Sequence, residues 1–130
     1  MNTFLEIKNH ILTALQSLFA LPSEKFASIE VQLNVDKEPS FGDVSCNAAM
    51  VLARELKQNP RQLAQQIQKH FELFEINGLG KVFEKVDIAG PGFLNFTFVG
   101  QIWKKIASEI YANKSLFFAL SEHEKNYNTA

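Results

Sequence analysis

The chain has 130 residues, of which 46% are hydrophobic and 21% are charged, and its formal net charge is −1. This balance predicts one globular domain with a hydrophobic core and excludes a disordered tail. The slightly negative charge excludes binding of nucleic acid through a broad basic surface, so such binding requires a local site or another part of a larger protein.

The segment 3–20 has the pattern of an amphipathic helix. Its apolar residues recur every three or four positions, and Asn2 or Thr3 is a suitable N-cap. The sequence Leu21-Pro22-Ser23 predicts the end of this helix. The apolar face consists of Phe4, Ile7, Ile11, Leu15, Leu18 and Phe19.

Residues 28–36 alternate between apolar and polar side chains, which predicts a strand with one buried face. A turn at 37–40 and a short extended piece at 41–44 are expected to follow. The buried face of the strand consists of Ile29, Val31, Leu33 and Val35.

Two helices are expected next. The first runs from about residue 46 to 57, is rich in small apolar residues, and has Asp43 or Ser45 as its N-cap. The second begins after Asn59, which suits the N-cap position, because Pro60 is well tolerated at the first helical position. Its apolar stripe consists of Leu63, Ala64, Ile67, Phe71 and Phe74.

The C-terminal half returns to strands. Residues 77–80 are expected to form a loop and residues 82–88 a strand. Gly90-Pro91-Gly92 predicts a tight turn into an antiparallel strand at 93–98, and a last helix at 101–111 follows. One face of the 82–88 strand consists of Val82, Val86 and Ile88.

The element order is therefore αββααββα. It predicts an α+β fold of two layers, in which helices cover a small antiparallel four-stranded sheet.

The sequence contains no pattern that points to catalysis or to a metal. His10, His70 and His123 are scattered and lack metal-ligand spacing to each other or to Cys46. Phosphate-binding loops, dinucleotide-binding fingerprints and nucleophile triads are missing too. Charged residues interrupt the apolar segment 1–19, which excludes a signal peptide or a membrane span. The single cysteine excludes an internal disulfide and suits a reducing cytoplasm.

The 93–98 strand carries a candidate binding face. Phe93, Asn95 and Thr97 share the side opposite the core-forming Leu94 and Phe96, a side that is expected to be wet. An exposed aromatic ring is a platform on which a base can stack, and such stacking contributes about 1–3 kcal/mol to binding. An Asn beside the ring can form hydrogen bonds with a base edge. The alternative interpretation is that Phe93 packs under the last helix.

Other candidate residues have structural alternatives. Gly42 allows a tight bend after Phe41, and Asp43 can cap the helix that follows, so this motif is interpreted as structural. Arg54 and Arg61 are candidates for contacts with phosphates. The same sequence pattern is equally expected for arginines on a solvent-exposed helix face without a binding role.

Two segments resemble parts of the arginyl-tRNA synthetases. Residues 39–50, with Phe41-Gly42-Asp43, Asn47 and Ala49-Met50, resemble one motif of that family, although Val44 stands where Tyr is usual. Residues 86–96, V-D-I-A-G-P-G-F-L-N-F, resemble a second motif. The motifs occur in the family's order, and the likeness covers about residues 3–112.

The resemblance implies a role in tRNA recognition. The family's N-terminal additional domain is an α+β module that touches the D-loop at the corner of the tRNA. Phe93 matches the aromatic residue that meets the base, and Asn95 matches the polar residue beside it. Gly90 stands where some members have Asn, so only its backbone can make a contact there. Phe41, Gly42, Asp43 and Asn47 belong to the structural motif.

The resemblance also implies the setting of the domain. We expect residues 1–112 to be the tRNA-recognition domain and residues 113–130 to be a linker toward a missing catalytic domain. That domain would bind ATP with magnesium and attach arginine to its tRNA, so this segment has no catalytic residue, no metal and no cofactor of its own. We expect a cytoplasmic monomer whose partners are arginine-specific tRNA and the catalytic domain, with no membrane contact. The alternative is a protein-interaction or structural module that does not bind RNA by itself.

Overall fold

The computed structural model describes residues 2–34 and 42–112. Four strands form one sheet in the order β1-β2-β6-β5, and all neighbouring strands are antiparallel. The expected turn at 37–40, the Phe41 position and the expected linker at 113–130 lie outside the described residues. The strands of this sheet are β1 (Val31–Leu33), β2 (Val44–Cys46), β5 (Phe83–Ala89) and β6 (Phe93–Phe98).

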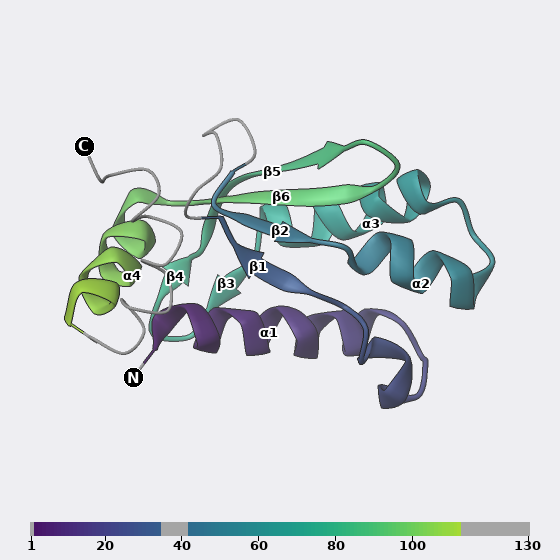
Figure 1. Cartoon of the computed structure of the whole chain (residues 1–130), viewed down its shortest axis with the longest axis horizontal. Helices are drawn as coiled ribbons and strands as arrows, with labels where there is room; N and C mark the ends of the chain where they lie inside the picture. Colours follow the sequence, from purple (N-terminus) through teal and green to yellow (C-terminus); the bar gives the residue numbers. More distant parts are fainter. Residues whose placement is uncertain (1, 35–41, 113–130) are drawn as a thin grey trace, which may run out of the picture.

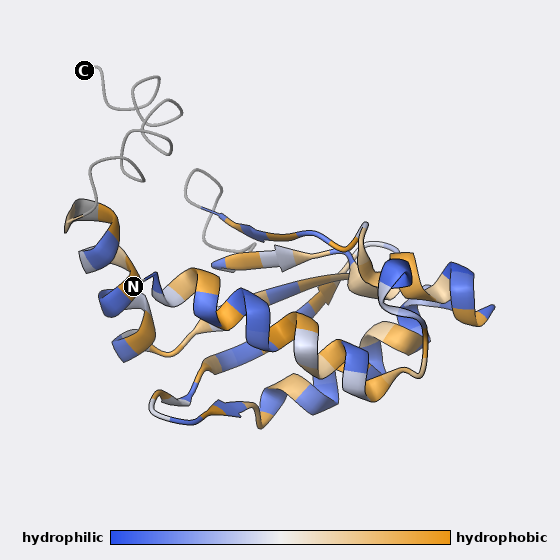
Figure 2. Cartoon of the chain, turned by 90° about the horizontal axis from the view of Figure 1, so that it is seen from below, coloured by the Kyte–Doolittle hydropathy of each residue, from blue (hydrophilic) through white to orange (hydrophobic). Residues whose placement is uncertain are grey.

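The helices cover one face of this sheet. In Figure 1, α1 runs beneath the strands and α3 behind them, while α2 and α4 lie at opposite ends. Seen from below, the helices carry alternating hydrophobic and hydrophilic bands, as the amphipathic pattern predicts (Figure 2). The predicted α+β class and antiparallel four-stranded sheet are confirmed. The helices are α1 (Thr3–Leu18), the 3-10 helix η1 (Ser23–Phe26), α2 (Ala48–Leu56), α3 (Pro60–Glu72) and α4 (Gly100–Ala112).

Two of the predicted N-caps are confirmed. The Asn2 side chain accepts a hydrogen bond from the backbone N–H of Leu5 at 3.0 Å and so begins α1. The Asn59 Oδ1 atom accepts from the backbone N–H groups of Arg61 and Gln62, at 2.9 and 3.2 Å. Both bonds satisfy donors that the first turn of a helix leaves without an intrahelical partner.

The predicted start of the second helix, at about residue 46, is wrong. Residues 44–46 pair with both β1 and β6, so they extend as β2, and α2 begins only at Ala48. Asp43 and Ser45 are therefore not caps. The Asp43 carboxylate instead accepts a hydrogen bond from the backbone N–H of Phe98 at 2.9 Å, which ties the start of β2 to the end of β6.

This carboxylate leads to a testable prediction. Replacing Asp43 with alanine removes the acceptor of a partly buried N–H group, so we expect a loss of about 1–3 kcal/mol in the free energy of unfolding. Asp43→Asn keeps a side-chain oxygen and should lose less. Urea denaturation of both variants measures the effect, and an Asp43→Ala protein as stable as the wild type would show that the bond does not contribute.

A two-stranded hairpin stands where a loop is predicted. Strands β3 (Glu75–Ile76) and β4 (Gly80–Lys81) pair antiparallel. Strands of two residues are too short to produce a detectable alternation in the sequence. In β5 the register shifts between Phe83 and Lys85, and as a result Phe83 is buried together with the predicted Val82 and Val86, while Ile88 is only half-buried.

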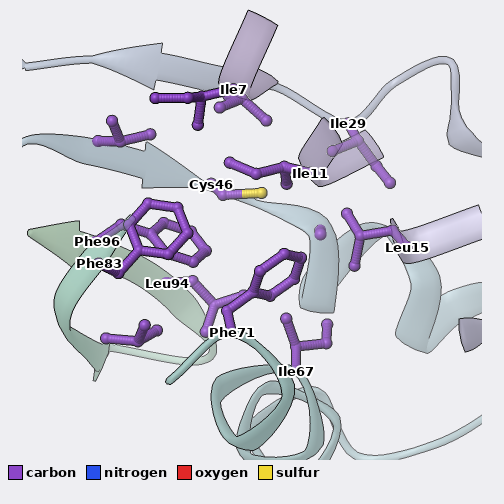
Figure 3. Close-up of a cluster of buried hydrophobic side chains, with 14 of the residues drawn as sticks. Ile7, Ile11, Leu15, Ile29, Cys46, Ile67, Phe71, Phe83, Leu94 and Phe96 are labelled. Atoms are coloured by element: carbon purple, nitrogen blue, oxygen red, sulfur yellow. The ribbon is translucent and has the colours of Figure 1, made fainter. Parts of the chain in front are cut away.

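The core lies between the sheet and the helices. Figure 3 shows side chains of α1 and α3 meeting those of the strands, with the rings of Phe71, Phe83 and Phe96 at the centre. The ring centroids of Phe83 and Phe96 are 4.6 Å apart, and those of Phe71 and Phe96 are 5.6 Å apart. Such ring pairs add stability beyond the burial of their area.

The sulfur of Cys46 lies within this core (Figure 3). Burial raises the pKa of the Cys46 thiol from 9.0 to about 11. Because the thiolate is the reactive form, we expect iodoacetamide to alkylate the folded protein about 100-fold more slowly than the urea-unfolded protein at the same pH. Equal rates in the two states would contradict this burial.

Candidate functional site

Phe93 is exposed on the face of the sheet that the helices leave open. It is the first residue of β6, follows the 90–92 turn, and has 42% of its surface accessible. The interpretation that it packs under the last helix is wrong, because α4 follows the other end of β6. The next core residues of β6, Leu94 and Phe96, point to the opposite side and are fully buried.

Asn95 shares the face of Phe93, but it is only 6% exposed. The expectation that this position is exposed to solvent is wrong. Because β6 is a central strand, Asn95 is flanked directly by Ser45 on β2 and Asp87 on β5. The Ser45 hydroxyl donates to Asn95 Oδ1 at 3.2 Å, and Asn34 Nδ2 donates to the same hydroxyl oxygen at 2.8 Å. A chain of hydrogen bonds thus links β6, β2 and Asn34, the residue that follows β1.

The turn before Phe93 is fixed against the start of α3. Arg61 Nη1 donates to the Gly90 carbonyl at 2.7 Å. Gly92 has a φ of +145°, and a Cβ atom there would lie 3.2 Å from the Pro60 carbonyl oxygen, so the turn needs a glycine at this close approach. Arg61 and Gly90, both expected as RNA contacts, therefore contact each other and hold the position from which the Phe93 ring projects.

Phe93 borders a groove of about 210 Å³ on the open face. This volume is below the range that is typical of drug-sized ligand pockets. It suits one planar ring rather than a whole nucleotide strand. We call it the Phe93 groove. It is lined by Glu30, Gln32, Ser45, Cys46, Asn47, Met50 and Phe93.

A second and larger depression of about 630 Å³ adjoins it and shares Asn47 and Met50 with it. Its charges are mixed, since Lys25 pairs with Glu55 at 3.3 Å and Arg54 lies beside them. Arg54 therefore lines the second depression and not the Phe93 groove. Asn47 and Met50, which line both, connect the two. The depression is lined by Glu24, Lys25, Ser28, Asn47, Met50, Val51, Arg54 and Glu55.

Sequence reasoning missed most of the groove. Glu30 and Gln32 alternate with the buried residues of the first strand, so their outward direction was predictable. Their position beside Phe93 depends on the pairing of β1 with β2 and of β2 with β6, which no local pattern reveals. Asn47 was expected only as part of the structural motif. Its Oδ1 atom does hold β1 by accepting from the backbone N–H of Glu30 at 2.7 Å.

Within residues 2–34 and 42–112, no cluster of three or more His, Cys, Asp or Glu residues is suited to hold a metal ion. None of the helices there has the length and apolar character needed to cross a membrane.

Comparison with known proteins relates the chain to one family. The model of the family described as "Arginyl tRNA synthetase N terminal domain" matches residues 5–98. An "Arginine--tRNA ligase" of Bradyrhizobium sp. is 45% identical over 74 residues, which are 57% of this chain and 11% of that protein. A protein of the same name from Staphylococcus epidermidis is 37% identical over 99 residues, 76% of this chain and 17% of the relative. One from Caldanaerobacter subterraneus is 41% identical over 92 residues, 70% of this chain and 16% of the relative.

Proposed function

Because the chain belongs to the family of arginyl-tRNA synthetase N-terminal domains, we propose that it binds tRNA and contacts the D-loop through Phe93. The observation that carries this proposal is the exposed ring of Phe93 beside a groove whose lining includes the side chains of Gln32, Asn47 and Ser45 together with Glu30. The single-stranded D-loop offers unstacked bases, which are the usual targets of aromatic side chains on RNA-binding sheets.

The proposal extends to the protein that would carry this domain. The chain spans only 11–17% of the length of the three ligases described above. We assign the attachment of arginine to tRNA, with ATP and magnesium, to a catalytic domain outside this chain. The domain itself would choose and orient the tRNA, as a cytoplasmic monomer packed beside that catalytic domain.

A protein-interaction module that does not bind RNA is the second candidate. The net charge of −1 and the mixed charges around Arg54 favour this candidate. Tight RNA binding usually requires many basic side chains that neutralise phosphates, and neither feature provides them. The two candidates differ in what the Phe93 groove contacts.

Nuclear magnetic resonance titration separates them. The ¹⁵N-labelled chain is titrated with arginine tRNA and with the same tRNA carrying a replaced D-loop. We expect weak binding of arginine tRNA only, with shifts concentrated at residues 45–47 and 90–95. Equal binding of both tRNAs, or shifts confined to other surfaces, would overturn the D-loop proposal.

A further inference from the structure

The guanidinium group of Arg61 lies at the end of the sheet where the chain turns from β5 into β6. Arg61 is the second residue of α3, and its Nη1 atom donates to the Gly90 carbonyl at 2.7 Å. Gly90 in turn lies against the Phe93 ring, since a Cβ atom at Gly90 would be 4.0 Å from Phe93 Cδ2. By bonded geometry, the Nη1 atom is therefore at most about 10 Å from the edge of the ring. A fixed cation thus stands beside the exposed aromatic surface.

Most of this guanidinium group is available to a ligand. An arginine carries five N–H donors in a planar fork, and in the described part of the chain only the Gly90 carbonyl accepts from Arg61. Among the same residues Arg61 has no ion pair, in contrast to Lys85 on β5, which pairs with Asp87 at 3.6 Å. Arg61 is also exposed to solvent. Because the bond to Gly90 already orients the fork, binding through the remaining donors costs less side-chain entropy.

The chemistry of this position favours a phosphate. The planar fork of a guanidinium group matches two phosphate oxygens, and charge-assisted hydrogen bonds of this kind are roughly twice as strong as neutral ones. Arg61 lies in the first turn of α3, where the helix dipole adds a partial positive charge. A nucleotide carries its phosphate one sugar away from its base. A base that stacks on Phe93 can therefore bring a phosphate of the same strand to Arg61.

We propose that Arg61 binds a backbone phosphate next to the base that stacks on Phe93, while its hydrogen bond to Gly90 holds the guanidinium group in place. This inference rests on the proposed function and adds a backbone contact to it. In a chain with a net charge of −1, such a cation supplies locally the phosphate neutralisation that the surface as a whole does not provide. The contact does not depend on the identity of the base, so it positions the strand and does not read its sequence.

A set of modified hairpins tests this contact. Each hairpin has the D-arm sequence of arginine tRNA and one loop phosphate replaced by an uncharged methylphosphonate, and fluorescence anisotropy measures its affinity. For the wild-type chain we expect one of these replacements to raise the dissociation constant about tenfold. Arg61→Gln should bind the unmodified hairpin about tenfold more weakly and show no response to that replacement. The slope of log affinity against log salt concentration should be smaller by about 0.7 for this variant, the contribution of one phosphate contact in a single strand.

A charge-matched variant separates the phosphate contact from other roles of Arg61. Lys69 is exposed in the last turn of the same helix, and Lys69→Gln should keep the wild-type response to every replacement. If Lys69→Gln loses the response as Arg61→Gln does, the effect reflects net charge alone and the inference is wrong. If Arg61 only braces the 90–92 turn, Arg61→Gln weakens all hairpins by the same factor and leaves the salt slope unchanged, which would also overturn the inference.

The outcomes distinguish this inference from the proposed function. If Phe93→Ala weakens the binding of every hairpin and no replacement depends on Arg61, the stacking role stands and the phosphate contact is wrong. If Phe93→Ala binds every hairpin as the wild type does, the proposed function fails, and this inference fails with it.

Discussion

Phe93→Ala is expected to weaken the binding of arginine tRNA by about 5- to 150-fold, because stacking of a base on an aromatic ring contributes about 1–3 kcal/mol. The ring is 42% exposed and lies outside the core, so the free energy of unfolding should change by only about 0.5 kcal/mol. Fluorescence anisotropy with labelled tRNA measures the first quantity, and urea denaturation measures the second.

A matched control comes from another exposed apolar residue. Leu73 is 83% exposed and lies at the end of α3, away from the Phe93 groove. Leu73→Ala should leave both tRNA binding and stability close to the wild-type values. If Leu73→Ala weakens binding as much as Phe93→Ala does, the binding surface is not the one proposed. If Phe93→Ala unfolds the chain, the ring is part of the core.

Gly42→Ala is expected to lower the free energy of unfolding by about 2–4 kcal/mol, the combined cost of a strained backbone and an overpacked contact. Gly42 has a φ of +74°, which disfavours any residue with a Cβ atom. That atom would also lie 2.9 Å from the backbone oxygen of Phe96, the same oxygen that accepts from the backbone N–H of Asp43 at 2.8 Å. The contact holds β2 against β6, so neither backbone can move away freely.

Gly80→Ala separates the two causes. Gly80 has a similar φ of +76°, but a Cβ atom there would meet nothing within 4 Å. This variant should therefore lose only the backbone term, about 1 kcal/mol. Urea denaturation of both variants gives the comparison, and equal losses would contradict the role of the close approach between Gly42 and Phe96.

The sequence was most informative where local patterns decide the structure. The apolar spacing of α1 and α3 and their Asn caps predicted both helices, since each signal acts within one or two turns. The start of α2 was misplaced, because β2 forms only through pairing with distant strands. The same long-range pairing buries Asn95, which local alternation placed on a wet face.

The candidate site divides in the same way. The outward direction of Phe93 followed from alternation along β6, whereas the arrival of Asn47 and Ser45 beside it depends on strand order. Arg61 stays a predicted candidate for a phosphate contact, and its hydrogen bond to Gly90 was not predictable because it depends on how α3 packs against the 90–92 turn. The proposed contact with the tRNA D-loop comes from the resemblance to a family, because no residue pattern in the sequence indicates it by itself.

A double-mutant cycle tests the contact between Phe93 and a D-loop base most directly. The wild-type chain and Phe93→Ala are each titrated with arginine tRNA and with the same tRNA carrying an abasic site at the contacted D-loop position. If the ring stacks on that base, the two changes are strongly non-additive, and Phe93→Ala costs almost nothing once the base is gone. Additive losses in the four affinities would show that Phe93 and the D-loop base do not touch.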